Sequence, residues 1–273
     1  MTFPSLFLSH GAPTLSLDDT PARAFLSGLG ERLGQPRAIL VASAHWDTER
    51  PRVTSTERNA TIHDFYGFPR ETFRLRYDAP GSPELAARVV DLLGAAGLGG
   101  ETDNSRGLDH GAWVPLSLIY PQADIPVAQV SIQGARGPEH HLRLGCALAP
   151  LREKGVLIVG SGSLTHNLGA FFDRDANDPA LDWVDAFADW TSDALLAGRV
   201  DDLVNYRRLA PRAVDNHPTD EHLLPLYVAM GAAGAEPRAE RLHKSATYGA
   251  LRMDVFAFGD PAADARPAKT RAA

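Results

Sequence analysis

Short apolar runs alternate with longer amphipathic segments along the chain, and this alternation predicts the elements of the fold. Four runs are almost continuously apolar, as in strands buried on both faces: 5–9, 37–44, 125–132 and 155–160. Residues 252–258 alternate between polar and apolar positions and predict a further strand. Because helices are predicted between these strands, the pattern favours an α/β fold with a mostly parallel central sheet and helices on both faces.

Five segments have the spacing and the end signals of helices: 21–33, 83–97, 140–154, 179–198 and 221–231. Thr20 is a plausible N-cap before Pro21, and Thr219 is a candidate N-cap for the last helix. No internal repeat or long linker interrupts the pattern, so we expect a single catalytic domain over 1–259. Residues 260–273 are rich in alanine, proline and charge and are predicted to form a flexible C-terminal tail.

Composition narrows the class of protein. The 273 residues are 44% hydrophobic and carry a net charge of −7, which argues against a binder of nucleic acid or of an anionic membrane. No apolar run approaches the ~20 residues of a membrane span, and the N-terminus lacks the basic region of a signal peptide. The single cysteine, Cys146, is expected to be buried and fits a reducing compartment, so we expect a cytoplasmic protein. The oligomeric state stays open, a homo-oligomer included.

Three histidines each follow a predicted buried strand: His10, His45 and His166. The carboxyl ends of parallel strands form the edge where α/β proteins bind ligands, so these imidazoles can converge. Small residues flank all three sites, which would let a metal and a substrate approach the backbone. Taken singly, a histidine after a strand is more often a capping or hydrogen-bonding residue than a metal ligand. The recurrence of three at one predicted edge makes a transition-metal site as strong an interpretation as that one.

A second group of histidines lies in the segment 215–226. His222 follows Glu221 in the expected first turn of a helix, where side chains can point into a cleft. The alternative is that Asp220 and Glu221 only complement the helix dipole and that His222 is a surface residue.

The other histidines give weaker signals. His110 follows Asp109, but adjacent side chains rarely face each other. His63 precedes Phe65, Tyr66 and Phe68, which could form an aromatic wall for a planar substrate or simply pack in a loop. His243 could line the same cleft, whereas His140 and His141, at a charged helix start, are expected on the surface.

Several other chemistries are excluded by missing motifs. The chain has no Gly-x-x-x-x-Gly-Lys-Ser/Thr phosphate loop and no His-Glu-x-x-His helix. The Ser161 segment does not match the Gly-x-Ser-x-Gly elbow, and no cysteine pair could hold a structural zinc.

The ordered set of motifs resembles the class III extradiol ring-cleavage dioxygenases, in the 4,5-DOPA-extradiol-dioxygenase-like branch of the family of the protocatechuate 4,5-dioxygenase β subunit. The motifs are Leu-Phe-Leu-Ser-His-Gly-Ala-Pro at 6–13, Ser-Ala-His-Trp at 43–46, Ile-His-Asp-Phe-Tyr-Gly-Phe-Pro at 62–69, Asp-His-Gly-Ala-Trp at 109–113, Thr-His-Asn-Leu at 165–168 and Glu-His-Leu-Leu-Pro-Leu at 221–226. Each motif alone is weak, but the series spans nearly the whole chain.

The resemblance implies roles for individual residues. His10 and His45 correspond to two metal ligands, and His222 corresponds to the third, with Glu221 beside it as the alternative. His166 corresponds to the acid–base histidine, which could also approach the metal. His110 corresponds to a histidine of the substrate pocket, and we place His63 and Tyr248 in the same pocket.

The implied chemistry explains these residue types. Three ligands on one face leave open positions for a catechol and O2, and Fe(II) is the expected metal, although a purified sample could carry Zn²⁺. We expect extradiol cleavage of DOPA or another catechol. A zinc hydrolase and a non-catalytic binding protein are the alternatives. Arg106, Lys244 and Arg252 could each pair with a substrate carboxylate or be ordinary surface residues.

Overall fold

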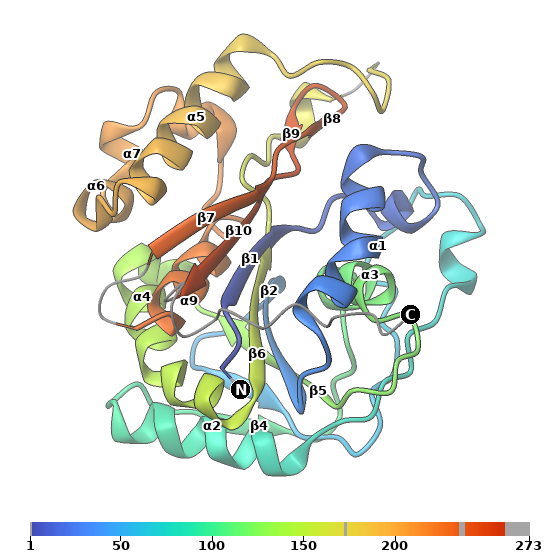
Figure 1. The fold of residues 1–273 in the computed structure, drawn as a ribbon, viewed down its shortest axis with the longest axis vertical. Helices are drawn as coiled ribbons and strands as arrows, with labels where there is room; N and C mark the ends of the chain where they lie inside the picture. Colours follow the sequence, from blue (N-terminus) through green and yellow to red (C-terminus); the bar gives the residue numbers. More distant parts are fainter. Residues whose placement is uncertain (1, 172–173, 235–237, 260–273) are drawn as a thin grey trace, which may run out of the picture.

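The computed structural model describes residues 2–171, 174–234 and 238–259, and its centre is an eight-stranded sheet (Figure 1). The strands lie in the order β4-β3-β5-β2-β6-β1-β10-β7. β5, β2, β6 and β1 are parallel neighbours, whereas β10 and β7 are antiparallel additions beside β1. The predicted α/β class with a mostly parallel sheet is therefore confirmed. The strands of this sheet are β1 Ser5–Ser9, β2 Ala38–Asp47, β3 Arg52–Thr54, β4 Glu101–Asp103, β5 Val127–Ile132, β6 Val156–Gly162, β7 Arg238–His243 and β10 Val255–Gly259.

Helices cover both faces of the sheet, as predicted. Figure 1 shows α1 and α3 on one side of the sheet and α4 and α9 on the other. Successive side chains of β2 point to opposite faces: Ile39 and Val41 pack with α1 and α3, while Leu40 and Ala42 pack with α2, α4 and α9. The main helices are α1 Pro21–Leu33, α2 Pro83–Ala95, α3 His110–Ile119, α4 Gly137–Leu148, α5 Asp182–Leu196 and α9 Leu224–Ala232.

Shorter elements connect these layers. Three helical pieces link α5 to the histidine segment that precedes α9: α6 Val200–Val204, α7 Tyr206–Leu209 and α8 Ala213–Asn216. β8 Ala246–Thr247 and β9 Leu251–Arg252 form a separate two-stranded sheet. Single turns of 3₁₀ helix occur at Pro13–Ser16, Thr72–Arg74, Gly134–Arg136 and Leu168–Ala170, and a longer one at Ala149–Lys154.

The last helix begins later than predicted. α9 starts at Leu224 rather than at Glu221, and Thr219 is not its N-cap. The Thr219 hydroxyl instead donates to Glu221 Oε1 at 2.8 Å. Pro225 explains the difference, because a proline is tolerated in the first turn of a helix, where its missing N–H costs no hydrogen bond. Glu221 and His222 therefore lie in a turn, outside the helix.

Three expectations about exposure are wrong. His140 and His141 are buried, because α4 starts at Gly137 and carries them over the end of β5. Cys146 is exposed, because the neighbouring Gly145 takes the contact position: a Cβ there would lie 2.2 Å from the Val228 carbonyl oxygen of α9. Arg252, one possible surface cation, is only 1% exposed and pairs with Asp254 and Asp185.

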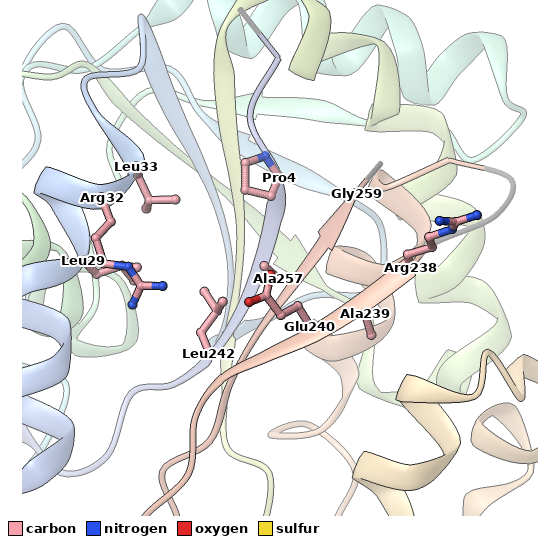
Figure 2. A pocket seen from close by; sticks show the side chains of 10 residues that line it. All are labelled: Pro4, Leu29, Arg32, Leu33, Arg238, Ala239, Glu240, Leu242, Ala257 and Gly259. Carbon is pink, nitrogen blue, oxygen red and sulfur yellow. The ribbon is translucent and has the colours of Figure 1, made fainter. Parts of the chain in front are cut away.

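A pocket of about 360 Å³ lies where the sheet extends beyond α1. Figure 2 shows Leu29, Arg32 and Leu33 of α1 on one side of it and Leu242 and Ala257 of β7 and β10 on the other. None of its lining residues is a histidine, so it cannot supply the predicted metal chemistry. Among the described residues, no helix combines the length and the apolarity needed to cross a membrane.

Candidate active site

Three histidines reach the carboxyl edge of the sheet, two of them from strands and one from a turn. His10 follows β1, and its backbone N–H donates to the Gly162 carbonyl of β6 at 2.9 Å. His45 lies in β2 beyond its last pair with β6, where the register with β5 is also irregular between Ala42 and Asp47. Such an irregularity re-aims side chains at the end of a strand. The third residue, His222, reaches the same edge from the turn before α9.

Glycines permit the close packing that brings these histidines together. A Cβ on Gly162 would lie 2.1 Å from the His222 carbonyl oxygen, and one on Gly160 would lie 2.1 Å from that of Pro225. A Cβ on Gly111 would lie 3.0 Å from Cδ2 of His45. These glycines therefore allow close packing at the strand ends. Gly160 and Gly162 admit the turn that carries His222, and Gly111 admits α3 against β2.

The Nε2 atoms of His10, His45 and His222 face one another. His45 Nε2 lies 3.0 Å from His10 Nε2 and 3.4 Å from His222 Nε2. Two nitrogens bound at right angles to one metal, each about 2.1 Å away, would be about 3.0 Å apart. His10 and His222 are only 2% and 5% exposed. The spacing and the donor type therefore fit one divalent transition metal.

The opposite nitrogens of these rings have protein partners. Ser161 Oγ donates to the Gly111 carbonyl and lies 3.1 Å from His10 Nδ1, so it can accept from an Nδ1–H. His222 Nδ1 lies 3.2 Å from Glu221 Oε1, and His45 Nδ1 lies 3.8 Å from Asp64 Oδ2. The acceptors within hydrogen-bond reach of Nδ1 in His10 and His222 favour the tautomer whose Nε2 lone pair is available to a metal.

Burial keeps the histidines of the centre neutral. It lowers the pKa of His10 and of His222 well below the usual 6.5, and neighbouring imidazoles lower both further. Burial and His110 lower the pKa of His45 to about 4, although Asp109 and Asp64 oppose the shift. At neutral pH these rings therefore keep their lone pairs.

His110 lies beside the three converging histidines at the first position of α3. Its ring centroid is 3.9 Å from that of His45. Asp64 Oδ1 accepts from the His110 backbone N–H at 2.9 Å and lies 3.0 Å from Nδ1. Burial alone would raise the pKa of Asp64, but the hydrogen bond and charge of His110 lower it to about 2. Asp109 does not pair with the adjacent His110; it caps α3 and accepts from Ser43 and Arg106.

His166 stacks on His222 with ring centroids 3.4 Å apart and an interplanar angle of 8°. Its backbone N–H donates to the Asn216 carbonyl at 2.8 Å, which ties its loop to the segment that carries His222. Burial, followed by the nearby His217, lowers the pKa of His166 to about 3. A neutral imidazole with this placement can accept a proton from a ligand in the adjoining pocket.

These five histidines line one pocket of about 690 Å³. Aromatic side chains form much of its remaining wall: Phe65, Tyr66, Phe68, Phe171 and Tyr248. His63 lies just behind this wall, 5.7 Å from Phe65 between ring centroids, with Nε2 3.0 Å from the Leu75 carbonyl oxygen. His243 lies elsewhere, stacked on Phe25 at 4.7 Å.

Sequence reasoning missed two supporting residues. Ser161 orients His10 from β6, and Asp64 contacts both His45 and His110 from a separate loop. Asp64 lies within the motif at 62–69, whereas the Ser161 segment matches no catalytic motif. Their partners are distant in sequence, so neither pairing could be seen without the fold.

Comparisons with known proteins show the family of the chain. Residues 4–256 match the family described as the catalytic LigB subunit of aromatic ring-opening dioxygenase, and the chain belongs to that family. It is 46% identical over 258 residues to a 4,5-DOPA dioxygenase extradiol of Beta vulgaris, an alignment that covers 93% of this chain and 96% of the relative. It is 40% identical over 238 residues to the Escherichia coli K12 protein of the same name, covering 86% and 87%. A crystal structure of an uncharacterized E. coli K12 protein superposes with a TM-score of 0.77 at 35% identity, covering 94% of this chain and 100% of that one.

Proposed function

We propose that this protein is an extradiol dioxygenase that opens the ring of a catechol and incorporates both atoms of O2. The observation that carries the proposal is the convergence of three neutral imidazoles at an aromatic-lined pocket. Membership of the aromatic ring-opening dioxygenase family supports it. The relatives named for 4,5-DOPA favour DOPA or a related catechol as the substrate.

One divalent metal would be held by His10, His45 and His222, with Fe(II) as the active metal, although purified protein could carry Zn²⁺. When bound, ferrous iron would let electron density pass from the catechol to O2, a redox role that d10 zinc cannot perform. We assign His222 rather than Glu221 as the third ligand. His222 directs Nε2 toward His45, while Glu221 lies at the Nδ1 side of the same ring.

The remaining residues would bind the substrate and move protons. His166, neutral at pH 7, would accept a proton from a catechol hydroxyl and return it as the ring opens. His110, fixed by Asp64, would donate a hydrogen bond to oxygen atoms of the substrate. Tyr248 and the aromatic wall, with His63 behind it, would hold the planar ring and exclude water.

The proposal also covers the bounds of the catalytic domain, its location in the cell and its partners. The catalytic domain would comprise 1–259; the predicted tail at 260–273 lies outside the described residues. We place the enzyme in the cytoplasm, with a small catechol and O2 as its partners and no nucleic acid or membrane, and leave room for a homo-oligomer.

Oxygen consumption tests the proposal directly. Protein loaded anaerobically with Fe(II) should consume O2 when given a catechol and develop the yellow absorbance of a ring-opened semialdehyde. The same protein loaded with Zn²⁺ should do neither. If a panel of catechols gives no O2 uptake while zinc-loaded protein hydrolyses esters or amides, the site is that of a hydrolase.

A further inference from the structure

The charged residues around the pocket indicate which charge the ring substituent of the substrate carries. In the stretches that the structure describes, no lysine or arginine lines the pocket, and the one charged residue besides histidine that does is Glu221. A substrate carboxylate would therefore meet no cation among these residues. An ammonium group would meet a carboxylate.

Four cations of the fold are held in ion pairs outside the pocket. Arg106 contacts Asp109 at 3.0 Å and lies over the Trp46 ring. Arg207 pairs with Asp220 on the outer side of the His222 turn. Arg252 and Lys244, both considered as carboxylate partners from the sequence, pair with Asp254 and Asp189. Recruiting any of them would break an existing ion pair.

Glu221 keeps one oxygen available to a ligand. Its Oε1 accepts from Thr219 at 2.8 Å and lies 3.2 Å from His222 Nδ1. Among the described residues, no donor reaches Oε2. The side chain is 31% exposed and lines the pocket, while the turn holds Oε1.

The aromatic wall favours the same charge. Phe65 and Phe68 meet edge to face at 5.5 Å, and Phe171 and Tyr248 lie 5.7 Å apart, so two loops present rings to the pocket. The faces of aromatic rings carry negative potential and attract organic cations. A carboxylate beside aromatic rings is the usual chemistry for binding an ammonium group.

We propose that the enzyme selects catechols that carry an ammonium group on the ring substituent, that Glu221 and the aromatic wall bind this group, and that a substrate carboxylate contributes nothing to recognition. This inference rests on the proposed function for the identity of the ring. It assigns Glu221 a binding role in addition to its contact with His222.

Four catechols distinguish the contribution of the substrate's ammonium group from that of its carboxylate. They are L-DOPA, which has both; dopamine, which lacks the carboxylate; 3,4-dihydroxyphenylpropanoate, which lacks the ammonium; and 4-ethylcatechol, which lacks both. We expect kcat/KM for dopamine to equal or exceed that for L-DOPA. Removal of the ammonium should lower kcat/KM about tenfold, as expected for a partly desolvated ion pair with cation–π contact.

The variant Glu221→Gln keeps an oxygen acceptor for His222 and removes the charge. We expect it to abolish the advantage of the two amines over 4-ethylcatechol, measured as the ratio of their kcat/KM values, with the metal content determined on the same sample. Glu240→Gln is the matched control, because Glu240 lies on β7 in the other pocket (Figure 2). An equal loss on all four catechols, or loss of metal, would show that Glu221 only orients or replaces a ligand and would overturn the proposal.

Binding without turnover separates this inference from the proposed function. Calorimetric titration of metal-loaded protein with the four compounds under anaerobic conditions measures the charge preference directly. A preference for the amines without O2 uptake would leave this inference standing and refute ring cleavage. Equal or tighter binding of 3,4-dihydroxyphenylpropanoate than of dopamine would overturn the inference, whatever the oxygen electrode shows.

Discussion

Two clusters of histidines lie at the carboxyl edge of the same sheet, and they differ in what their nitrogens face. In the first, His10, His45 and His222 direct Nε2 atoms toward one another. In the second, His140 and His141 surround Gln133 at the end of β5. His140 Nε2 contacts Gln133 Oε1 at 3.0 Å, and His141 bonds the Gln133 backbone N–H with one nitrogen and the Gly137 carbonyl with the other.

Burial does not distinguish the two clusters. It lowers the pKa of His141 to about 4, the same value that burial and His110 give to His45. What differs is hydrogen bonding: both nitrogens of His141 are used within the protein, whereas the facing Nε2 atoms of the first cluster need an external Lewis acid. The direction of lone pairs, more than burial or pKa, therefore marks a metal site in this fold.

The largest expected effect comes from removing one histidine of the proposed metal site and comparing it with a histidine of the second cluster. His45→Ala should abolish stoichiometric Fe(II) and Zn²⁺ binding and remove catechol-dependent O2 uptake, because two nitrogens remain where three converged. His141→Ala should keep its metal despite removing an equally buried imidazole. Metal analysis after loading and desalting measures both. Unchanged metal content in His45→Ala would contradict the site.

A smaller effect is expected when a histidine of the pocket that is not a ligand is replaced. His166→Gln should retain metal and lower kcat by about 10² to 10⁴, the range for loss of a general acid–base group. Steady-state O2 uptake at saturating catechol, with metal content measured on the same sample, gives the ratio. Loss of metal in this variant would instead make His166 a ligand.

The support of His10 can be weakened without touching the ligands. Ser161→Ala removes the acceptor at His10 Nδ1, and loss of such an outer-shell partner typically lowers metal affinity 10- to 100-fold. Competition with a chelator of known affinity measures this change. Ser163→Ala, two residues further along the chain, is the control, because its hydroxyl donates to the Thr165 carbonyl instead. Equal affinities in the two variants would exclude an orienting role for Ser161.

The smallest effect concerns the second cluster and pH. The pKa of His141 is about 4 when folded and near 6.5 when unfolded, so the unfolded chain binds more protons between these values. The free energy of unfolding should therefore fall as the pH drops from about 6.5 to 4. His141→Gln should cost roughly 1–3 kcal/mol at neutral pH and flatten this pH dependence. Urea denaturation of metal-free protein at several pH values tests the slope, and an unchanged slope would assign the titration to other groups.

Local patterns predicted the elements that carry strong end signals. Thr20 accepts from the Arg23 N–H ahead of Pro21, and α1 spans the expected residues. α3 was not predicted, since Pro115 interrupts it and nearly all its side chains are apolar and buried, so no amphipathic period is visible. β7 was missed because charged residues such as Arg238 and Glu240 alternate along an edge strand.

The histidines themselves could be predicted, since each follows a recognisable strand or motif. Their supporting contacts could not. His110 meets Asp64 rather than the adjacent Asp109, and Glu221 lies beside His222 in a turn rather than in a helix. These facts depend on how distant segments pack, and sequence spacing carries no information about that.

The three converging histidines are far apart in sequence, so the metal site can form only late in the synthesis of the chain. His10 and His45 are 35 positions apart, and His45 and His222 are 177 apart. A chain emerging from the ribosome cannot assemble the centre until the His222 turn has been synthesised and has packed against the sheet. A metal that binds only the native arrangement raises the free energy of unfolding. The supply of iron would therefore influence how much folded enzyme a cell retains.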